Sequence, residues 1–299
     1  MAKAGAWWQF TKERFEPASH LSMIVVFIFA HILVVNATES IFATSLNDLV
    51  MLIGVVAFYF KLRLYDEVKD YELDVVINKT RPLPRGLLNH KDMYTGMVVC
   101  ILIELVTFAS MGLNSLMSMI VAILYSLLMY KEFFIREKIR PYLTTYALTH
   151  TVVTVLLSFA IFSFLSTENL LKLVTNTTLV SFAMANWLLF NIFEFGRKTF
   201  ASSEERTSVD TYSSLFGRTG AVVLVVSQAV IAHFLTLSLR GANHAFSLWS
   251  SGILLSILGI LSLRYIMTDN PAAAKHYRLF SSVYIILFYV LLIFSHIIP

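Results

Sequence analysis

The chain has 299 residues, of which 57% are hydrophobic and only 14% are charged, and its mean hydropathy is +0.72. A soluble domain carries about 25% charged residues, so this composition excludes an ordinary soluble protein. The net charge of +4 gives no indication of a nucleic-acid partner, and the single cysteine, Cys100, excludes a disulfide framework and a thiolate metal site. We therefore expect an all-α membrane protein.

The first segment, residues 1–18, combines aromatic and basic side chains in a pattern typical of a short amphipathic helix. We expect this helix to lie in the headgroup layer of the bilayer, and a disordered tail is the alternative. Its aromatic residues are Trp7, Trp8, Phe10 and Phe15, and the basic residues among them are Lys3, Lys12 and Arg14.

Residues 19–299 are predicted to form a single transmembrane domain, because nine apolar runs follow one another and about 20 apolar residues suffice to cross a bilayer. We expect nine transmembrane helices in a bundle around a central cavity that opens toward the cytoplasm and sideways to lipid. Only Met111, Gly112 and Leu113 separate the third run from the fourth. The nine runs are 21–38, 46–65, 93–111, 114–131, 143–165, 178–196, 218–238, 246–265 and 279–298.

The positive charges indicate the orientation of these spans. With the N-terminus inside, all but Lys172 and Arg240 of the 23 Lys and Arg residues fall on the cytoplasmic side. Cytoplasmic segments of membrane proteins are enriched in Lys and Arg, so we expect a multi-pass protein with a cytoplasmic N-terminus and an outer C-terminus. The long charged linkers are then all cytoplasmic, which places the expected active site at the cytoplasmic face.

Residues 63–86, at the end of the second apolar run, contain five acidic residues followed by three basic residues. Asp66, Asp70 and Asp74 are spaced to stack along one helical face, where like charges repel unless cations lie among them. Rows of hard oxygen ligands suit Mg²⁺, and the position at a membrane face favours this metal over the alternative, a solvated helix end paired with Lys69 and Lys79. The five acids are Asp66, Glu67, Asp70, Glu72 and Asp74, and the basic residues are Lys79, Arg81 and Arg85.

This stretch resembles the first aspartate-rich motif of the UbiA-type intramembrane prenyltransferases, NDxxDxxxD followed by a KxxRPLPxG-like turn. Here the motif is Asp66-Glu67-x-x-Asp70-x-x-x-Asp74, and the turn is Asn78-Lys79-Thr80-Arg81-Pro82-Leu83-Pro84-Arg85-Gly86. The leading Asn-Asp of the family is replaced by Asp-Glu, which keeps oxygen ligands. The resemblance covers essentially the whole chain, because nine helices with this motif after the second is the family's layout. It implies catalytic Asp66, Asp70 and Asp74, a metal site formed by these three with Glu67, and substrate binding by Lys79 and Arg81.

The family's second acidic motif, approximately DxxxDxxxGxxT followed by a Gly, resembles residues 191–221 only in part. Thr211 and Gly217 fall at the expected interval, and Glu204 takes the last Asp position, whereas the earlier Asp position falls at Phe200 or near Glu194. Glu204 is therefore expected to be catalytic and to bind metal with Glu205. Either basic residues bind phosphate where relatives use a second Mg²⁺, which we favour, or this branch has altered or lost the reaction. The expected substrate-binding residues of the loop are Glu194, Arg197, Lys198, Asp210 and Tyr212.

Polar residues elsewhere add weaker signals. In the linker after the fourth span, Lys131, Arg136 and Lys138 could hold diphosphate oxygens, and simple membrane anchoring is the alternative for each of them. Asn191 shares a helical face with the second motif, which makes it the preferred acceptor or diphosphate contact. Most other polar residues inside spans are better explained as helix–helix hydrogen bonds. Glu104 is expected to be protonated, paired or lining a polar cavity.

The residues and the resemblance together predict Mg²⁺-dependent transfer of an isoprenyl group from a prenyl diphosphate to a lipophilic, aromatic, quinone-precursor-like acceptor. Carboxylates and cations would hold the diphosphate while the allylic bond ionises, and aromatic faces would stabilise the carbocation. Two alternatives stay open. A catalytically silent binder of isoprenoid lipids is supported by the irregular second motif, whereas a cation transporter is disfavoured because the acids lie at one face, not at the midplane. No pattern indicates the oligomeric state.

Overall fold

The structure is a computed structural model that describes residues 3–39, 46–206, 209–237 and 239–298. In these ranges the regular elements are all helices. The chain divides into two compact units: unit 1 comprises Met1–Ile28 and Thr44–Phe134, and unit 2 comprises Phe29–Ala43 and Ile135–Pro299. Three expected boundaries, residues 1–2, 238 and 299, lie outside the described residues.

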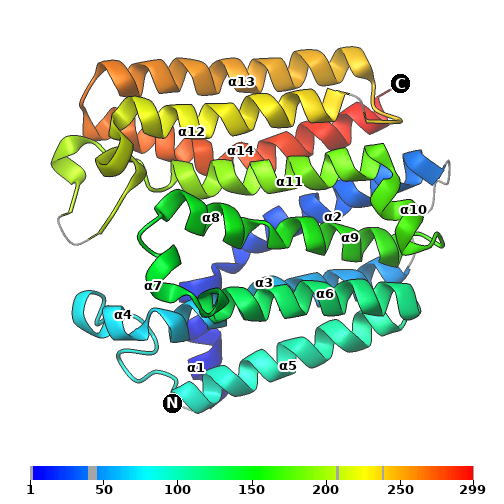
Figure 1. Ribbon diagram of the computed structural model, residues 1–299, viewed down its shortest axis with the longest axis horizontal. Helices are drawn as coiled ribbons and strands as arrows, with labels where there is room; N and C mark the ends of the chain where they lie inside the picture. Colours follow the sequence, from blue (N-terminus) through cyan, green and yellow to red (C-terminus); the bar gives the residue numbers. More distant parts are fainter. Residues whose placement is uncertain (1–2, 40–45, 207–208, 238, 299) are drawn as a thin grey trace. The chain divides into compact units, whose positions relative to one another are not determined.

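Unit 1 is built on two long helices, α3 and α5, that pack along each other, with α6 beside them. Figure 1 shows these helices in blue to green. The unit contains α1 (Lys3–Phe10), the π-helical turn η1 (Thr11–Phe15), the first part of α2 (Pro17–Glu39), α3 (Leu46–Lys69), α4 (Tyr71–Ile77), α5 (His90–Ala109), α6 (Leu113–Tyr130) and η2 (Glu132–Phe134).

Small residues allow α3 and α5 to approach closely. A Cβ atom added at Gly54 of α3 would collide with the side chains of Thr107 and Phe108 on α5. Helices in membranes associate through close van der Waals packing, since lipid tails are as apolar as the side chains themselves. The end of α3, which carries the acidic stretch, is therefore fixed against α5.

The N-terminal segment packs into the core of unit 1. Phe10 and Phe15 are buried, and their rings meet the ring of Phe60 at centroid distances of 5.9 and 5.4 Å. On the opposite side of the segment, Trp8 is 59% exposed. The segment thus has one buried and one exposed side, and its location in the headgroup layer stays a prediction.

Unit 2 is organised around α11, which packs against α8, α9, α10, α12 and α14. Its four longest helices are coloured green to red in Figure 1. The unit contains the second part of α2, α7 (Arg136–Ile139), α8 (Leu143–Thr151), α9 (Val153–Leu165), α10 (Leu170–Thr175), α11 (Thr177–Gly196), η3 (Ser202–Glu204), α12 (Tyr212–Leu237), α13 (His244–Met267) and α14 (Pro271–Ile297).

Buried hydrogen bonds fix α11 in place. Asn186 donates to Ser158 Oγ of α9 (3.0 Å) and accepts from Tyr289 Oη of α14 (2.9 Å). His31 of α2 joins this network through Ser158 (3.0 Å), and all four side chains are fully buried. A satisfied polar network in an apolar interior specifies one packing arrangement, because each lost partner leaves a costly buried polar group.

Eight of the nine expected spans are helices that are long and apolar enough to cross a membrane, among the residues that the structure describes. The expected span 143–165 matches Leu143–Leu165, in which α8 and α9 meet at Val152. The remaining span, 46–65, lies within α3, a helix of 24 residues that carries more charges than the others. The chain is therefore an integral multi-pass membrane protein, whereas the count of nine spans and the central cavity stay predictions.

Two glycines mark helix boundaries near predicted features. Gly112 has a φ of 105° and forms the tight connection between α5 and α6. Gly217 has a φ of 67° and interrupts α12, so the apolar part of that helix begins where the sequence predicted it. Positive φ values of this kind are readily adopted only by glycine.

Candidate functional site

The acidic stretch of unit 1 lies where α3 ends and α4 begins, and its backbone hydrogen bonding continues across that junction. The Asp70 N–H donates to the carbonyl of Asp66 (3.0 Å), and the Asp74 N–H donates to the carbonyl of Asp70 (2.9 Å). Bonds between residues four apart place the three aspartates one helical turn from each other. The backbone therefore has the stacking that the sequence spacing predicts.

Asp66 and Asp74 find cationic partners within the same stretch. Asp66 is half-exposed and contacts Arg63 Nη1 (3.4 Å) and Lys69 Nζ (3.3 Å). Asp74 is 2% exposed and accepts from the side chains of Asn78 (2.8 Å) and Arg81. These cations reduce the repulsion that stacked carboxylates would otherwise produce.

Glu67 is the most buried acid of the stretch, at 1% exposure. Its Oε1 atom accepts a hydrogen bond from Arg14 of η1, whereas Oε2 is buried and has no donor among the described residues. Burial raises the pKa of Glu67, and the charge of Arg14 and the peptide group of Leu83 oppose that rise. Glu67 therefore presents one bound and one open oxygen.

The basic turn after the acids is attached to the N-terminal segment. Arg85 donates to both carboxylate oxygens of Glu13 (2.8 Å each) and to the carbonyl of Thr80 (2.6 Å). This guanidinium holds the pKa of Glu13 below its ordinary value. Lys79, an expected substrate contact, is exposed on the same turn.

In unit 2, α11 ends in a compact charged group. Arg197 donates to both oxygens of Glu194 (2.7 and 2.9 Å), and Lys198 lies 3.2 Å from the same carboxylate. All three residues were expected to bind substrate, which stays a prediction. The group holds two cations at the end of an apolar helix, where they could contact an anionic headgroup.

Asn191 lies one turn earlier on α11 and is fully buried. Its side-chain oxygen accepts from Thr151, and its amide donates to Gln228 Oε1 of α12 (3.1 Å). This is the arrangement of a helix–helix hydrogen bond, in which both polar atoms are already used. Contact between Asn191 and a substrate stays a prediction.

Glu204 is bound by a residue that the sequence did not indicate. Arg278 of α14 donates to both of its oxygens (2.9 and 2.8 Å), and the Ala201 N–H adds a third bond (3.0 Å). Arg278 also donates to the Thr199 carbonyl (2.9 Å), and its guanidinium lies 4.5 Å from the ring of Phe200. These contacts fasten the loop to α14, and they hold the pKa of Glu204 below its ordinary value.

Glu205, next in sequence, is bound by hydroxyl groups. Thr211 donates to its carboxylate (2.7 and 2.9 Å), and Ser213 donates to Oε1 (2.6 Å). Of the remaining residues expected to bind substrate, Asp210 is exposed, whereas Tyr212 is fully buried against the ring of Phe195. The loop therefore uses its acids to hold its own fold.

The third cluster is divided between the two units. Lys131 follows α6 in unit 1, whereas Arg136 and Lys138 lie on α7 in unit 2, and all three are exposed. Residues 132–134, directly after Lys131, have φ values of 48°, 54° and 57°, a region that non-glycine residues seldom occupy. Exposure suits both diphosphate binding and membrane anchoring, so both roles stay predictions.

Glu104 is paired, which was one of the three outcomes expected for it. Its Oε2 atom lies 2.5 Å from Lys61 Nζ of α3, and both side chains have zero exposure. The ammonium group also lies 4.4 Å from the ring centre of Phe58. Lys61 was missed as the partner, although a lysine inside an apolar run is the signal that could have identified it.

The donor chemistry of unit 1 fits Mg²⁺, although no three His, Cys, Asp or Glu side chains among the described residues come together as a metal-binding group. Asp66, Glu67 and Asp70 offer carboxylate oxygens, and the open Oε2 of Glu67 is buried. Mg²⁺ needs only one or two carboxylates, because phosphate oxygens and water complete its shell. The half-exposed Asp66 has longer contacts with Arg63 and Lys69 (3.4 and 3.3 Å). Closer donors already occupy both carboxylate oxygens of the other expected ligands, Asp74, Glu204 and Glu205.

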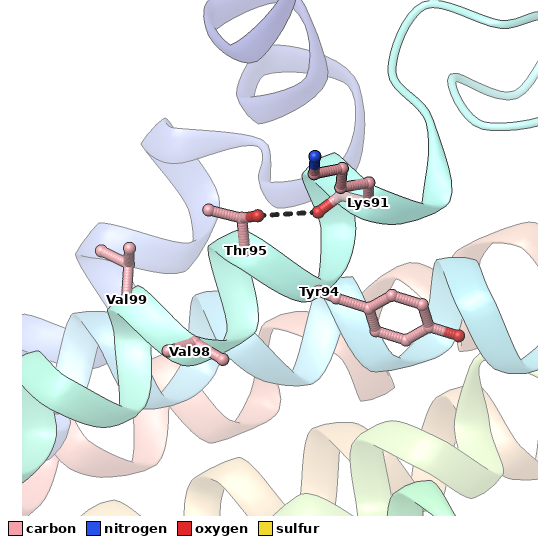
Figure 2. A pocket seen from close by; sticks show the side chains of 5 residues that line it. All are labelled: Lys91, Tyr94, Thr95, Val98 and Val99. Carbon is pink, nitrogen blue, oxygen red and sulfur yellow. Dashed lines mark hydrogen bonds between the residues drawn. The ribbon is translucent and has the colours of Figure 1, made fainter.

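Figure 2 shows a hollow on α5 that is lined by residues of this one helix: Lys91, Tyr94, Thr95, Val98 and Val99. Their spacing of three and four residues places them on a single face, and all five are exposed. The Thr95 hydroxyl donates to the Lys91 carbonyl (2.8 Å), so it is satisfied within the helix. This open, mostly apolar depression is not the expected substrate cavity.

Comparisons with known proteins agree with this fold. No protein-family model and no curated protein matches the chain. One solved structure, of a digeranylgeranylglyceryl phosphate synthase in membranes, is similar with a TM-score of 0.62 and 15% identity, over 99% of this chain and 99% of that one. That synthase is a UbiA-type prenyltransferase, which confirms the predicted resemblance at the level of the fold. The chain therefore has the fold of a UbiA-type prenyltransferase.

Proposed function

We propose that this protein transfers an isoprenyl group from a prenyl diphosphate to a lipophilic acceptor within the membrane, in a Mg²⁺-dependent reaction. The observation that carries the proposal is the acidic stretch of unit 1. It combines a buried carboxylate that has an open oxygen with a basic turn, at the end of α3, in a chain with this fold. A substrate with a polyanionic head and a long hydrocarbon tail matches such a combination.

Asp66, Glu67 and Asp70 are the residues proposed to hold the metal. Bound Mg²⁺ would neutralise the charge that develops on the diphosphate oxygen as the allylic C–O bond breaks. Direct metal binding by Asp74, Glu204 and Glu205 stays a prediction, since these carboxylates already have donors within the chain.

Cationic side chains are proposed to bind the remaining diphosphate oxygens. In unit 1 these are Lys79 and Arg81, and Asp74 fixes the direction of the Arg81 guanidinium. Phosphate binding by Arg197 and Lys198, which Glu194 holds at the end of α11 in unit 2, stays a prediction. Each lysine carries three N–H donors and each arginine five, so one carboxylate partner does not use their full bonding capacity. Hydrogen bonds between ionised groups are the strongest available for such a headgroup.

The hydrocarbon tail and the acceptor are proposed to lie among apolar and aromatic side chains. Each buried methylene of the isoprenoid contributes about 0.8 kcal/mol to binding. Aromatic residues make up 14% of the chain, and their ring faces attract the carbocation that forms when the diphosphate leaves. We propose an aromatic acceptor of the quinone-precursor type, whose nucleophilic carbon or oxygen attacks this cation and then releases a proton.

The proposal is tested with protein purified in detergent, geranylgeranyl or farnesyl diphosphate, a panel of aromatic and lipid acceptors, and either Mg²⁺ or EDTA. We expect Mg²⁺-dependent release of diphosphate together with a prenylated product. Asp70→Asn and Asp74→Asn should abolish both. Glu168→Gln, which removes an exposed ion pair with Lys172 in unit 2, is the matched control and should keep the activity.

Two other results would contradict the proposal in recognisable ways. Tight binding of prenyl diphosphate without turnover of any acceptor would identify a silent isoprenoid-binding protein. Ion flux in liposomes that prenyl diphosphates do not affect would identify a transporter.

The proposed orientation, with a cytoplasmic N-terminus and active site and an outer C-terminus, has a separate test. Cys100 is the single cysteine and can be replaced by alanine to provide a cysteine-free background. A membrane-impermeant maleimide applied to intact cells should then label Lys172→Cys but not Lys275→Cys. Labelling in the opposite pattern would reverse the orientation.

A further inference from the structure

The N-terminal segment of unit 1 makes two ion pairs from neighbouring residues, and each reaches a different part of the acidic and basic stretch. Glu13 binds Arg85 of the basic turn through both oxygens, whereas Arg14 binds Glu67 at the end of α3. The segment is held in place by the buried rings of Phe10 and Phe15. Arg14 therefore approaches Glu67 from a fixed element.

The two ion pairs differ in exposure. The side chains of Glu13 and Arg85 are 34% and 30% exposed, so this surface ion pair contributes little to the free energy of folding. The side chain of Glu67 has zero exposure, and that of Arg14 is 21% exposed. A buried carboxylate that loses its cationic partner can turn toward another donor. The ion pair with Arg14 thus fixes the direction of the Glu67 carboxylate.

The second oxygen of Glu67 is buried and accepts no hydrogen bond from the described residues, although the peptide group of Leu83 and the charge of Arg81 lie near this carboxylate. A buried charged oxygen left without a partner is costly, and native structures rarely keep one without a reason. A cation that enters with an anionic ligand would satisfy it. In many metal sites a second residue binds one side of a ligand and so orients its other side toward the metal. Glu67 has this arrangement, because Arg14 binds Oε1 while Oε2 stays open.

We propose that Arg14 is a positioning residue that holds Glu67 so that Oε2 can bind a divalent cation, which makes the N-terminal segment a working part of the cation site. This inference rests on the proposed function for the identity of the anionic ligand, but it is tested by cation binding alone. Arg14 does not contact the cation in this arrangement, because a guanidinium is itself positive.

The test measures Mn²⁺ binding to the full-length protein in detergent, followed by electron paramagnetic resonance. Arg14→Gln should weaken Mn²⁺ binding about 10- to 100-fold, the usual effect of losing a residue that orients a metal ligand. Arg14→Lys keeps the positive charge and should recover part of the affinity. Lys12→Gln, on the exposed side of the same segment, is the matched control and should bind Mn²⁺ like the wild type.

Glu13→Gln separates positioning from simple attachment, because it breaks the neighbouring ion pair with Arg85 and leaves Arg14 intact. It should change Mn²⁺ affinity less than about threefold, as expected for an exposed pair. A thermal unfolding curve for each variant shows whether it remains folded. If Arg14→Gln unfolds, the test uses Arg14→Lys instead, and its Mn²⁺ affinity is compared with that of Glu13→Gln.

The inference is overturned if the wild type binds no Mn²⁺, if Arg14→Gln binds it like the wild type, or if Glu13→Gln loses as much affinity as Arg14→Gln. Its failure is distinguishable from failure of the proposed function. Wild-type turnover with unaltered Mn²⁺ binding in Arg14→Gln removes only the role of Arg14. Loss of Mn²⁺ binding in Arg14→Gln, without turnover by the wild type, removes only the prenyl transfer.

Discussion

The acidic stretch of unit 1 and the loop of unit 2 are both rich in carboxylates, yet they use them differently. In the loop, Glu204 and Glu205 are fully bonded to an arginine, a peptide N–H and two hydroxyl groups of the same unit. In the stretch, Glu67 keeps a buried oxygen open. The number of acids in a motif therefore does not show how many are available to a ligand, because neighbouring residues and one distant arginine, Arg278, already occupy some of them.

The largest effect is expected from removing Lys61, the cation that pairs with one oxygen of the buried acid Glu104. Lys61→Met should lower the free energy of unfolding by about 3–5 kcal/mol, because it leaves the carboxyl group of Glu104 without its partner in an apolar interior. The double variant Lys61→Met with Glu104→Leu should recover most of that loss. Chemical denaturation in detergent measures both. A single variant as stable as the wild type would show that Glu104 does not depend on Lys61.

The next prediction compares the open acid with a bonded one. Glu67→Gln should lower turnover about 100-fold or more, equivalent to about 3 kcal/mol of lost transition-state stabilisation, because it removes a proposed metal ligand. Glu205→Gln should keep most of the activity, since its carboxylate serves the loop. Steady-state assays with saturating Mg²⁺ measure the difference. Equal losses of turnover in Glu67→Gln and Glu205→Gln would show that the open and the bonded carboxylate do not differ in their importance for the reaction.

A smaller effect is expected where the loop of unit 2 is fastened to α14. Arg278→Gln removes both bonds to Glu204, so amide hydrogen exchange in residues 199–206 should accelerate about tenfold, the equivalent of about 1.4 kcal/mol. Mn²⁺ affinity should not change. Lys275→Gln, an exposed substitution on the same helix, is the control. An unchanged exchange rate would mean that other contacts hold the loop.

The smallest effect is the pH dependence of the same ion pair. Arg278 holds the pKa of Glu204 below its ordinary value, so the pair stabilises the loop above the pKa of an unfolded glutamate, about 4.3. This contribution, about 1 kcal/mol for a partly exposed pair, should disappear as the pH falls through the lower folded pKa. Exchange rates of the loop between pH 5 and pH 3 (roughly the span around that value) measure it, with Glu204→Gln as a pH-insensitive reference.

The sequence predicted features that depend on local pattern. Eight spans, the turn at Gly112 and the helical spacing of the aspartates all follow from hydrophobic periodicity and near neighbours. The contacts of Glu194 with Arg197 and Lys198 are also local, because these residues lie three and four positions apart on one helix.

Contacts between distant segments were not predicted. Arg14 lies 53 residues from Glu67, and Arg278 lies 74 residues from Glu204. No local pattern selects these partners from the other cations, because the choice depends on how the helices pack. The same reason explains why Glu104 could be expected to need a partner while Lys61 was not identified as that partner.

The ion pair between Lys61 and Glu104 also bears on how the chain enters the bilayer during synthesis. A charged residue inside a nascent span raises its insertion free energy, by up to about 2.5–3.5 kcal/mol at the centre of the span, and here each helix of the pair carries one such buried residue. Neutralisation becomes possible only after α5 has emerged from the ribosome. We therefore expect α3 to leave the translocon together with α5, as a hairpin, and a truncated chain that ends before His90 to integrate poorly.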